Sequence, residues 1–331
     1  MKKLINQPTD YVEEMLAGLL LANPGLQRDA GSGRVIRRAS GAKAGKVGIA
    51  SGGGSGHLPL FTGYVGEGLL DTCAIGNVFE GPNVASCEEA IRLAHGGAGV
   101  LCLYGNYGGD RMNFDMACEL LDGEGIATRT VLGTDDIASA APDEAHKRRG
   151  VAGILYAYKA AGAIAESGAS LDEVTRIAQK AVNATRTIGV ALSPCRVPTA
   201  GAPNFSIADD EIEMGTGIHG EPGIWRAKLK SADAIVDEML ERLLADRPIA
   251  SGSRVSVLVN GLGATPLEEL FILYRRTHQI LVDRGIAIVQ PLVGNYVTSM
   301  EMAGASISLQ LLDAELEKLL LAPASCPFWK V

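Results

Sequence analysis

Three glycine-rich segments that contain histidine or aspartate are the parts of this sequence that could do chemistry. They are Ser51-Gly-Gly-Gly-Ser-Gly-His57, Tyr104-Gly-Asn-Tyr-Gly-Gly-Asp110 and Gly215-Thr-Gly-Ile-His219-Gly-Glu-Pro-Gly223. The first two follow predicted strands, and the backbone N–H groups of glycine-rich turns bind oxygen-rich ligands. Ligands of open α/β sheets collect at the carboxyl ends of strands, so these two turns could converge on one small polar metabolite.

Two familiar nucleotide-binding patterns do not fit the first segment. A P-loop ends in Gly-Lys-Ser/Thr, whereas here Gly56 is followed by His57 and Leu58. A dinucleotide fingerprint counted from Gly52 meets His57 where its third glycine belongs. An enzyme that acts alone through a glycine-loop nucleotide site is therefore disfavoured. A tight corner between a strand and the helical pattern of residues 60–70 stays open as a structural interpretation.

The candidate polar residues also have structural interpretations. Asp110 could act as a general base or as the N-cap of a helix over residues 111–121, and its residue type alone favours the cap. Glycines on both sides of His219 leave its ring sterically open, but an ordinary surface turn would do the same. A fourth segment, Asn260-Gly-Leu-Gly-Ala-Thr265, is interpreted as structural, with a loop that reaches toward the site.

The elements that must position these segments are short β-branched runs that alternate with longer helical patterns, which is typical of α/β architecture. Strands are predicted over 46–50, 99–104, 127–132, 187–192, 254–259 and 286–289. Helices are predicted over 84–95, 150–167, 170–184 and 265–283, with N-terminal capping signals at Asn83, Ser170 and Thr265. A chain of 331 residues is too long for one core. We expect two α/β domains, 1–185 and 186–331, each a mixed or mostly parallel sheet flanked by helices.

Composition excludes several classes of protein. The net charge of −8 and the lack of a basic stripe argue against nucleic-acid binding. The six cysteines form no C-x-x-C pair and no metal-binding spacing, so reduced thiols are expected. The sequence shows no signal peptide and no apolar run of about 18 residues, which predicts a cytoplasmic protein without a membrane span.

Taken together, the segments resemble the substrate-binding subunit of dihydroxyacetone kinases, the DhaK family. The resemblance runs from the N-terminal Met-Lys-Lys-Leu-Ile-Asn nearly to the C-terminus and includes the motif Gly217-Ile-His-Gly-Glu-Pro-Gly223. It implies that His219 adds to the carbonyl carbon of a ketose as a reversible covalent hemiaminal. The neutral imidazole is a competent nucleophile near neutral pH. Such capture selects a ketone or an aldehyde and rejects glycerol.

The resemblance also implies roles for the other site residues. Asp110 contacts the terminal hydroxyl of the substrate and acts as a general base, so capping is not its sole role. His57 hydrogen-bonds the substrate and shares the acid–base work, and Gly54 supplies a backbone contact. Glu221 is interpreted, from the sequence, as a partner that orients His219.

No cofactor and no metal are expected on this chain. The resemblance implies that ATP or ADP with Mg²⁺ is carried by a DhaL-type partner subunit, recharged by a third subunit where a phosphotransferase relay exists. Nothing in the chain supplies the helical nucleotide domain of the fused ATP-dependent form, so we expect the split form. A homodimer is also implied.

The identity of the substrate and the biological role stay open. Familiar members continue with Glu-Pro after the first histidine, whereas this chain has Leu58-Pro59-Leu60-Phe61. This more apolar lip makes the four-carbon ketose erythrulose an alternative to dihydroxyacetone. A ketose-sensing coactivator is the alternative from another class of protein. The presence of His57, Asp110 and His219 favours catalysis, because a sensor needs the capturing histidine but no base.

Overall fold

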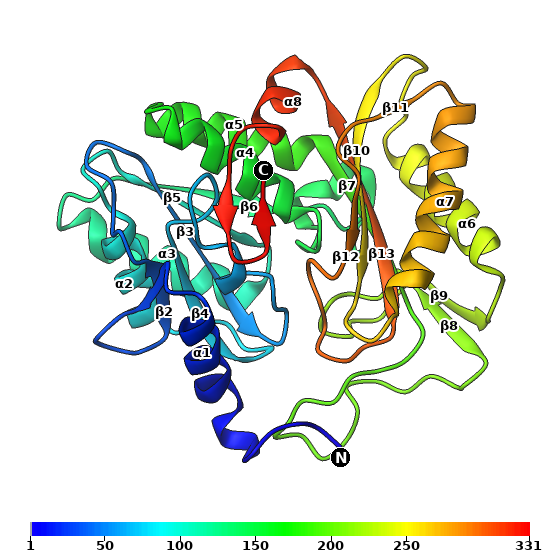
Figure 1. The fold of residues 1–331 in the computed structure, drawn as a ribbon, viewed down its shortest axis with the longest axis horizontal. Coiled ribbons are helices and arrows are strands. Elements are labelled where there is room, and N and C mark those ends of the chain that lie inside the picture. Colours follow the sequence, from blue (N-terminus) through cyan, green and yellow to red (C-terminus); the bar gives the residue numbers. More distant parts are fainter. Residues whose placement is uncertain (1) are drawn as a thin grey trace.

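The computed structural model describes residues 2–331 and contains a six-stranded sheet, a seven-stranded sheet and a terminal hairpin. Figure 1 shows the two large sheets side by side, with helices around and between them. The first sheet has the spatial order β1 (Leu26–Arg28), β2 (Val35–Arg38), β4 (Thr72–Val78), β3 (Gly48–Ser55), β5 (Val100–Gly105) and β6 (Thr128–Gly133). The strands from β4 to β6 are parallel, and β1 and β2 run antiparallel at one edge. The carboxyl ends of β3 and β5 therefore lie at the same end of the sheet.

The second sheet is mixed. Its spatial order is β11 (Ala287–Ile288), β10 (Arg254–Gly261), β13 (Gly304–Leu312), β7 (Thr185–Ala191), β8 (Glu211–Met214) and β9 (Trp225–Lys228), and β12 (Leu292–Gly294) also pairs with β10. Strand β10 is parallel to β11 and β12, whereas β13, β7, β8 and β9 form antiparallel pairs. The central strand β13 was not among the predicted strands. Two mixed sheets flanked by helices confirm the predicted α/β class.

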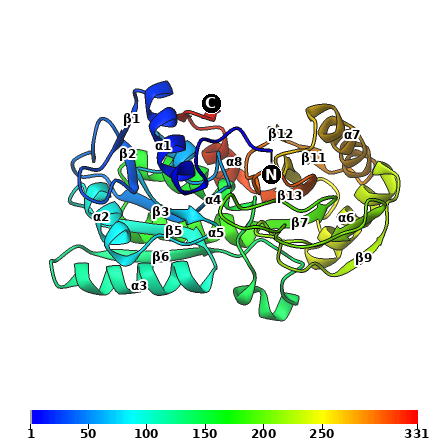
Figure 2. The same ribbon diagram turned by 90° about the horizontal axis from the view of Figure 1, so that it is seen from below.

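Helices cover both faces of the sheets. Their bounds are α1 (Tyr11–Ala22), α2 (Val84–Ala94), α3 (Gly108–Asp122), α4 (Ile154–Glu166), α5 (Leu171–Ala184), α6 (Ala232–Asp246), α7 (Leu267–Asp283) and α8 (Ala314–Leu320). Figure 2 shows α3 along the outer side of the first sheet, and Figure 1 shows α6 and α7 on the outer side of the second. Among residues 2–331, no helix combines the length and the apolar character that crossing a bilayer requires.

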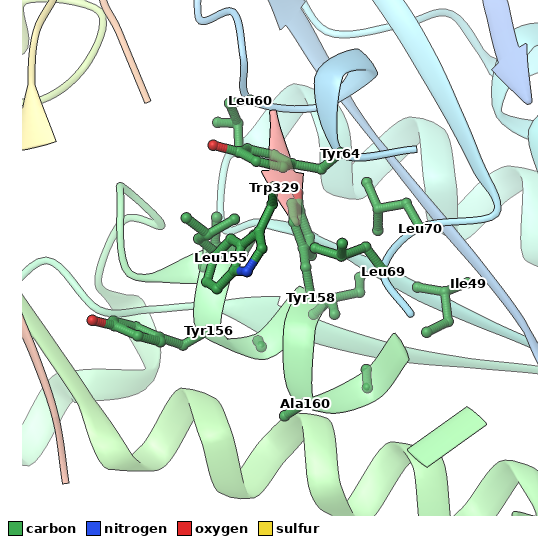
Figure 3. Close-up of a cluster of buried hydrophobic side chains, with 14 of the residues drawn as sticks. Ile49, Leu60, Tyr64, Leu69, Leu70, Leu155, Tyr156, Tyr158, Ala160 and Trp329 are labelled. Carbon is green, nitrogen blue, oxygen red and sulfur yellow. The ribbon is translucent and has the colours of Figure 1, made fainter. Parts of the chain in front are cut away.

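Helix α4 connects the two sheets. The Tyr158 hydroxyl lies 2.7 Å from Ser51 Oγ of β3, and the Tyr156 hydroxyl lies 3.0 Å from Ser256 Oγ of β10. The apolar residues of α4 belong to a buried cluster that includes Trp329 of the terminal hairpin, β14 (Ser325–Cys326) and β15 (Trp329–Lys330), as Figure 3 shows. Each large apolar side chain buried there contributes about 1.5–3 kcal/mol. This cluster holds the two sheets together.

Two of the predicted helix caps are confirmed. Asn83 Oδ1 accepts a hydrogen bond from the Ser86 backbone N–H at 2.9 Å, and α2 begins after it. Ser170 Oγ accepts one from the Glu173 backbone N–H at 3.3 Å at the start of α5. These bonds satisfy N–H groups that the first helical turn leaves without an intrahelical partner.

The capping box predicted at Thr265 is wrong. Helix α7 begins after Pro266, and no side chain caps it. The Thr265 hydroxyl instead donates to the Gly304 carbonyl at 2.7 Å and accepts from the Gly304 N–H at 2.8 Å. Thr265 therefore ties the loop after β10 to the first residue of β13, a contact that depends on the tertiary fold.

The glycine-rich segment 51–57 is largely a strand rather than the predicted turn. Strand β3 continues through its glycines to Ser55. A Cβ on Gly53 would lie 2.1 Å from the Phe61 ring, and one on Gly54 would lie 2.8 Å from the Glu80 backbone nitrogen. These glycines let neighbouring segments pack close to the strand. The chain turns out of the sheet only at Gly56, where φ is +100°.

The helical pattern of residues 60–70 does not form an α-helix. The segment contains one short 3₁₀ turn, Thr62–Tyr64, and is otherwise irregular. Its apolar residues are buried in the main cluster, so tertiary packing uses them without a helix. No helix N-terminus therefore follows the first glycine segment, and the predicted anion-binding geometry is absent from this part of the described chain.

Candidate active site

The structure brings the four predicted site residues together around one small cavity: Gly54, His57, Asp110 and His219. Strands β3 and β5 end at this cavity, and the loop between β8 and β9 brings His219 to it from the second sheet. The other lining residues are Leu60, Phe61, Gly105, Tyr107, Gly150, Ile154 and Ile218. Larger hollows lie elsewhere and contain none of the four. The predicted site residues therefore converge on one small cavity, to which both sheets contribute.

His57 presents an unprotonated ring nitrogen. Its Nδ1 lies 2.7 Å from the Thr298 carbonyl oxygen, which can only accept, so Nδ1 carries the proton. Its Nε2 is buried and has no hydrogen-bond partner among residues 2–331. Burial, and next the neighbouring His219, lower the pKa of His57 to about 3. The ring is therefore neutral near pH 7, and its Nε2 can accept a hydrogen bond from a ligand.

His219 is held by a carboxylate. Its Nδ1 lies 2.8 Å from Glu221 Oε1, and its backbone N–H donates to Glu221 Oε2 at 2.9 Å. Burial raises the pKa of Glu221, but the hydrogen bond and charge of His219 and the charge of Arg149 outweigh it and lower that pKa to about 2. The ionised Glu221 accepts from Nδ1, so in the neutral His219 ring the lone pair resides on Nε2.

Aromatic rings surround the two histidines. The His57 and His219 ring centroids are 4.7 Å apart at an interplanar angle of 76°. Phe79 stacks on His57 at 5.0 Å, and Tyr107 meets the His219 ring edge-on at 4.8 Å. The Tyr107 hydroxyl donates to the Gly150 carbonyl at 3.0 Å, which holds the ring in place. Packing from several elements therefore fixes the orientation of both imidazoles.

Backbone strain is concentrated beside the histidines. Phe61 and Phe79 have φ values of +69° and +61°, a region that bulky L-residues rarely adopt. Met300, at φ +55°, donates its N–H to the Gly56 carbonyl at 2.7 Å. Such conformations cost about 1–3 kcal/mol each and persist only where the surroundings enforce them. Three strained residues around His57 indicate a site shaped for more than stability.

Asp110 lies in the first turn of α3 but does not cap it. Tyr107 occupies the N-cap position, and no side chain makes a capping bond, so the cap interpretation is wrong. The Asp110 carboxyl is buried, and its Oδ1 has no hydrogen-bond partner in the described chain. A Cβ on Gly81 would lie 2.2 Å from this Oδ1, so glycine makes room for it. Burial raises the pKa of Asp110 to about 6, although the His219 charge opposes the shift.

The fourth glycine segment supports the site from behind, as its loop position suggested. Asn260 Oδ1 accepts from the N–H groups of Tyr296 and Val297 at 2.9 and 2.8 Å, and Asn260 Nδ2 donates to the Val297 carbonyl at 2.8 Å. These bonds shape the loop whose Thr298 carbonyl holds His57. Asn260 therefore positions the site without lining the cavity.

Sequence reasoning missed Phe79, Tyr107 and Arg149. Tyr107 belongs to the second glycine segment, and its place next to flanking glycines was a usable clue. Phe79 follows β4, a strand that was not predicted, and nothing in its local sequence points to a left-handed backbone. Arg149 sits in a short basic run, Lys147-Arg-Arg149, that resembles a solvated surface cluster.

The apolar segment of residues 58–61 contributes to two different hollows of the molecule. Leu60 and Phe61 line the cavity, whereas Leu58 and Pro59 line a separate surface hollow beside the N-terminal segment. Within this segment, Leu60 and Phe61 are therefore the residues that make the cavity wall apolar.

The fold and cavity define an α/β protein with a small cavity where the strands of one sheet meet a loop of the other. Residues 17–328 match the Dak1 domain model. The chain is 44% identical over 333 residues to the PTS-dependent dihydroxyacetone kinase 2, dihydroxyacetone-binding subunit DhaK, of Listeria innocua, with 100% of both chains covered. It is 43% identical over 330 residues to the D-erythrulose kinase of Mycolicibacterium smegmatis, covering 100% of this chain and 57% of that relative. The chain belongs to the Dak1 family, and dihydroxyacetone kinase subunits of the DhaK type are among its relatives.

Solved structures of relatives have the same fold. The native dihydroxyacetone kinase of C. freundii superposes with a TM-score of 0.91 at 34% identity, covering 99% of this chain and 60% of that chain. The dihydroxyacetone kinase operon co-activator DhaQ superposes with a TM-score of 0.89 at 34% identity, covering 96% of this chain and 98% of that chain. One fold therefore occurs both in a kinase and in a co-activator.

Proposed function

We propose that this chain is the ketose-binding subunit of a dihydroxyacetone-type kinase, and that it captures a short ketose covalently on His219. The hydrogen bond between His219 Nδ1 and Glu221 carries the proposal, because it leaves Nε2 as the nucleophilic nitrogen of the neutral ring. His219 lines the same small cavity as His57 and Asp110, so a sugar bound there would lie against this ring.

The capture step is an addition to a carbonyl group. The Nε2 lone pair of His219 forms a bond to the ketone carbon, and the C=O π electrons move to the oxygen. The carbonyl oxygen gains a proton and Nδ1 loses its proton, so the net change moves one proton from ring to oxygen. The Nε2 of His57 can then accept a hydrogen bond from the new hydroxyl. Glycerol has no electrophilic carbon and cannot form this bond.

Asp110 is proposed as the general base of phosphoryl transfer. A terminal hydroxyl of the captured ketose must lose its proton as its oxygen attacks phosphorus. The unpartnered Oδ1 of Asp110 is a buried acceptor in the same cavity. Burial makes this carboxylate more basic than an ordinary aspartate, which improves proton transfer near neutral pH.

The phosphoryl donor is proposed to be ATP or ADP with Mg²⁺ on a DhaL-type partner subunit. Relatives that match this chain over nearly their whole length are named dihydroxyacetone-binding subunits of PTS-dependent or PEP-dependent kinases. A C. freundii kinase solved with AMP-PNP and Mg²⁺ is a longer chain, of which this chain covers 61%. We also propose that the subunit forms a homodimer, as the family resemblance implies.

Two further assignments have specific support. Erythrulose is the second candidate substrate, because relatives at 41–43% identity are named erythrulose kinases and Leu60 and Phe61 make the cavity wall apolar. A ketose-sensing role is the second candidate function, because the co-activator DhaQ has the same fold. Phosphorylation of a bound ketose by a reconstituted complex separates the kinase from the sensor.

Ketose selectivity tests the proposed function directly. Dihydroxyacetone, both erythrulose enantiomers and glycerol are titrated into the protein in a calorimeter. We expect at least one ketose to bind and glycerol to give no heat at the same concentrations, because only a ketone can bond to the ring. Comparable binding of glycerol would contradict covalent capture, and the ketose with the highest affinity would identify the substrate.

The pH dependence of turnover tests the role of Asp110. Burial raises its pKa to about 6, and a base works only when it is deprotonated. At saturating ketose with the partner subunit, we expect kcat to be flat above that pH and to fall about tenfold per unit below it. A kcat that stays constant down to pH values around 5 would exclude Asp110 as the base.

A further inference from the structure

A chain of partly or fully buried charged groups leads away from His219. Glu221, which holds the His219 ring, has its Oε2 3.9 Å from Arg149 Nη1. Arg149 Nε in turn donates to Asp136 Oδ2 at 2.9 Å, and its Nη2 lies 2.8 Å from the same oxygen. The Asp136 side chain is only 3% exposed. The guanidinium thus lies between two carboxylates, one of which contacts the proposed nucleophile.

The surrounding backbone is shaped around these groups. A Cβ on Gly217 would lie 2.2 Å from Glu221 Oε2 and 2.8 Å from Arg149 Nη1, so only glycine leaves room for both. Arg149 Nη2 also donates to the Gly215 carbonyl at 3.3 Å, and Asp136 Oδ1 accepts from the Ala138 N–H at 3.0 Å. Arg149 and Asp136 come from the segment between β6 and α4, whereas Glu221 comes from the β8–β9 loop. The arginine therefore joins the loop that carries His219 to the segment between β6 and α4.

The charges in this cluster do not cancel. The hydrogen bond and charge of His219 and the charge of Arg149 outweigh burial and hold the pKa of Glu221 at about 2. Burial, partly offset by Arg149, raises the pKa of Asp136 to about 6. Near pH 7 the single positive charge of Arg149 is therefore shared between two ionised carboxylates, those of Glu221 and Asp136. A carboxylate beside an imidazole favours the protonated form of the ring. The protonated ring has no lone pair with which to attack a ketone. The extent to which Arg149 compensates the charge of Glu221 therefore affects what fraction of the rings is nucleophilic.

We propose that Arg149 and Asp136 are positioning residues for His219. Arg149 compensates the negative charge of Glu221 while Glu221 keeps the His219 Nδ1 oriented, and Asp136 limits that compensation. The inference rests on the proposed capture of a ketose by His219. Neither residue lines the cavity, so both act through Glu221.

The other groups around His219 are the same in the variants that test this inference. The titratable and charged groups near the ring, from the elements packed around it, are His57, Asp110, Tyr107, Glu221 and, behind Glu221, Arg149. His57 is neutral near pH 7, and burial raises the pKa of the Tyr107 phenol well above its usual range. Asp110 lines the same cavity, changes charge near pH 6 and interacts with the His219 charge. Substitutions at Arg149 and Asp136 leave Asp110 in place.

The test uses two substitutions with opposite electrostatic signs. Arg149→Met removes the compensating cation. We therefore expect the pH below which ketose affinity falls to rise by about one unit. Asp136→Asn removes the competing anion, so we expect ketose affinity to begin to fall at a lower pH than in the wild type. Affinity at pH 8 should change less than affinity at pH 6, because an imidazole is less protonated at higher pH. A merely structural role would weaken binding in both variants at every pH.

Control variants separate charge from packing. Arg149→Lys keeps the cation and should restore most of the wild-type pH profile. Arg129→Met removes an arginine that is 53% exposed and should leave the profile unchanged. The His219 ring is also followed without any ketose, by ¹⁵N-detected titration of the histidine side chains, where Arg149→Met should move the His219 titration upward.

The outcomes distinguish this inference from the proposed function. If the wild-type protein binds no ketose but the ring titrations shift in opposite directions, the electrostatic coupling stands and the capture proposal fails. If the wild-type protein binds ketose and both variants titrate like the wild type, the positioning role is wrong. Shifts of the same sign in Arg149→Met and Asp136→Asn would also overturn it.

Discussion

Replacing His219 by alanine is expected to abolish tight binding of the ketose and, with it, phosphorylation. The covalent bond to the ring is lost, and the remaining polar contacts contribute only about 0.5–1.5 kcal/mol each. A loss of affinity of about a hundredfold or more corresponds to about 2.7 kcal/mol. Calorimetry measures the affinity. A one-bond coupling between ¹³C-labelled ketose carbon and ¹⁵N-labelled histidine reports the C–N bond in the wild type and should be absent from the variant.

A matched control for this substitution exists on α7. His278 is exposed, lines none of the described hollows near the site, and can be replaced by alanine without touching the cavity. We expect His278→Ala to bind ketose like the wild type. Because His219 packs against Tyr107 and Phe79, thermal unfolding of His219→Ala establishes that the variant is folded. Unchanged affinity in folded His219→Ala would remove covalent capture from the mechanism.

Replacing Asp110 by asparagine is expected to spare ketose binding and to reduce phosphoryl transfer by about 10²–10⁴-fold. Asparagine has nearly the same shape and fits the space beside Gly81, so the capture by His219 is retained. It cannot accept the proton of the attacking hydroxyl, so the chemical step loses its base. The kcat is measured with a reconstituted nucleotide-binding subunit at saturating ketose, and the affinity is measured by calorimetry.

Asp115 provides the control on the same helix. It is exposed on α3, one helical turn or more beyond the cavity, and Asp115→Asn should turn over like the wild type. Full activity of Asp110→Asn would show that another group accepts the proton. If Asp110→Asn instead lost ketose affinity by the same factor as its activity, Asp110 would be a binding residue rather than a base.

Local sequence was sufficient for features that depend on neighbouring residues. Asn83 and Ser170 were predicted as caps because their side chains reach backbone N–H groups three residues away. The alternation of strands and helices predicted the α/β class for the same reason, since periodicity is a local property. The residues lining the cavity, His57, Asp110 and His219, were also chosen from the sequence, because glycine-flanked polar residues and a family resemblance single them out.

Features that depend on distant segments were not predictable in this way. The glycines at 52–54 were expected to form a turn, but they continue β3, and their lack of side chains leaves room for Phe61, Phe79 and Glu80 to pack against it. Thr265 was expected to cap a helix, but it binds a strand that begins at Gly304. In both cases the competing interaction comes from a segment whose position the local pattern does not contain.

The sequence by itself determined which residue types are available for ketose chemistry and on which local elements they lie. Only the tertiary structure decided how they act together. The carbonyl that sets the His57 tautomer belongs to Thr298, 241 residues further along the chain. The carboxyl of Asp110 becomes a stronger base because other segments bury it. Proton positions and basicity depend on distances and burial, which exist only once separate segments have packed.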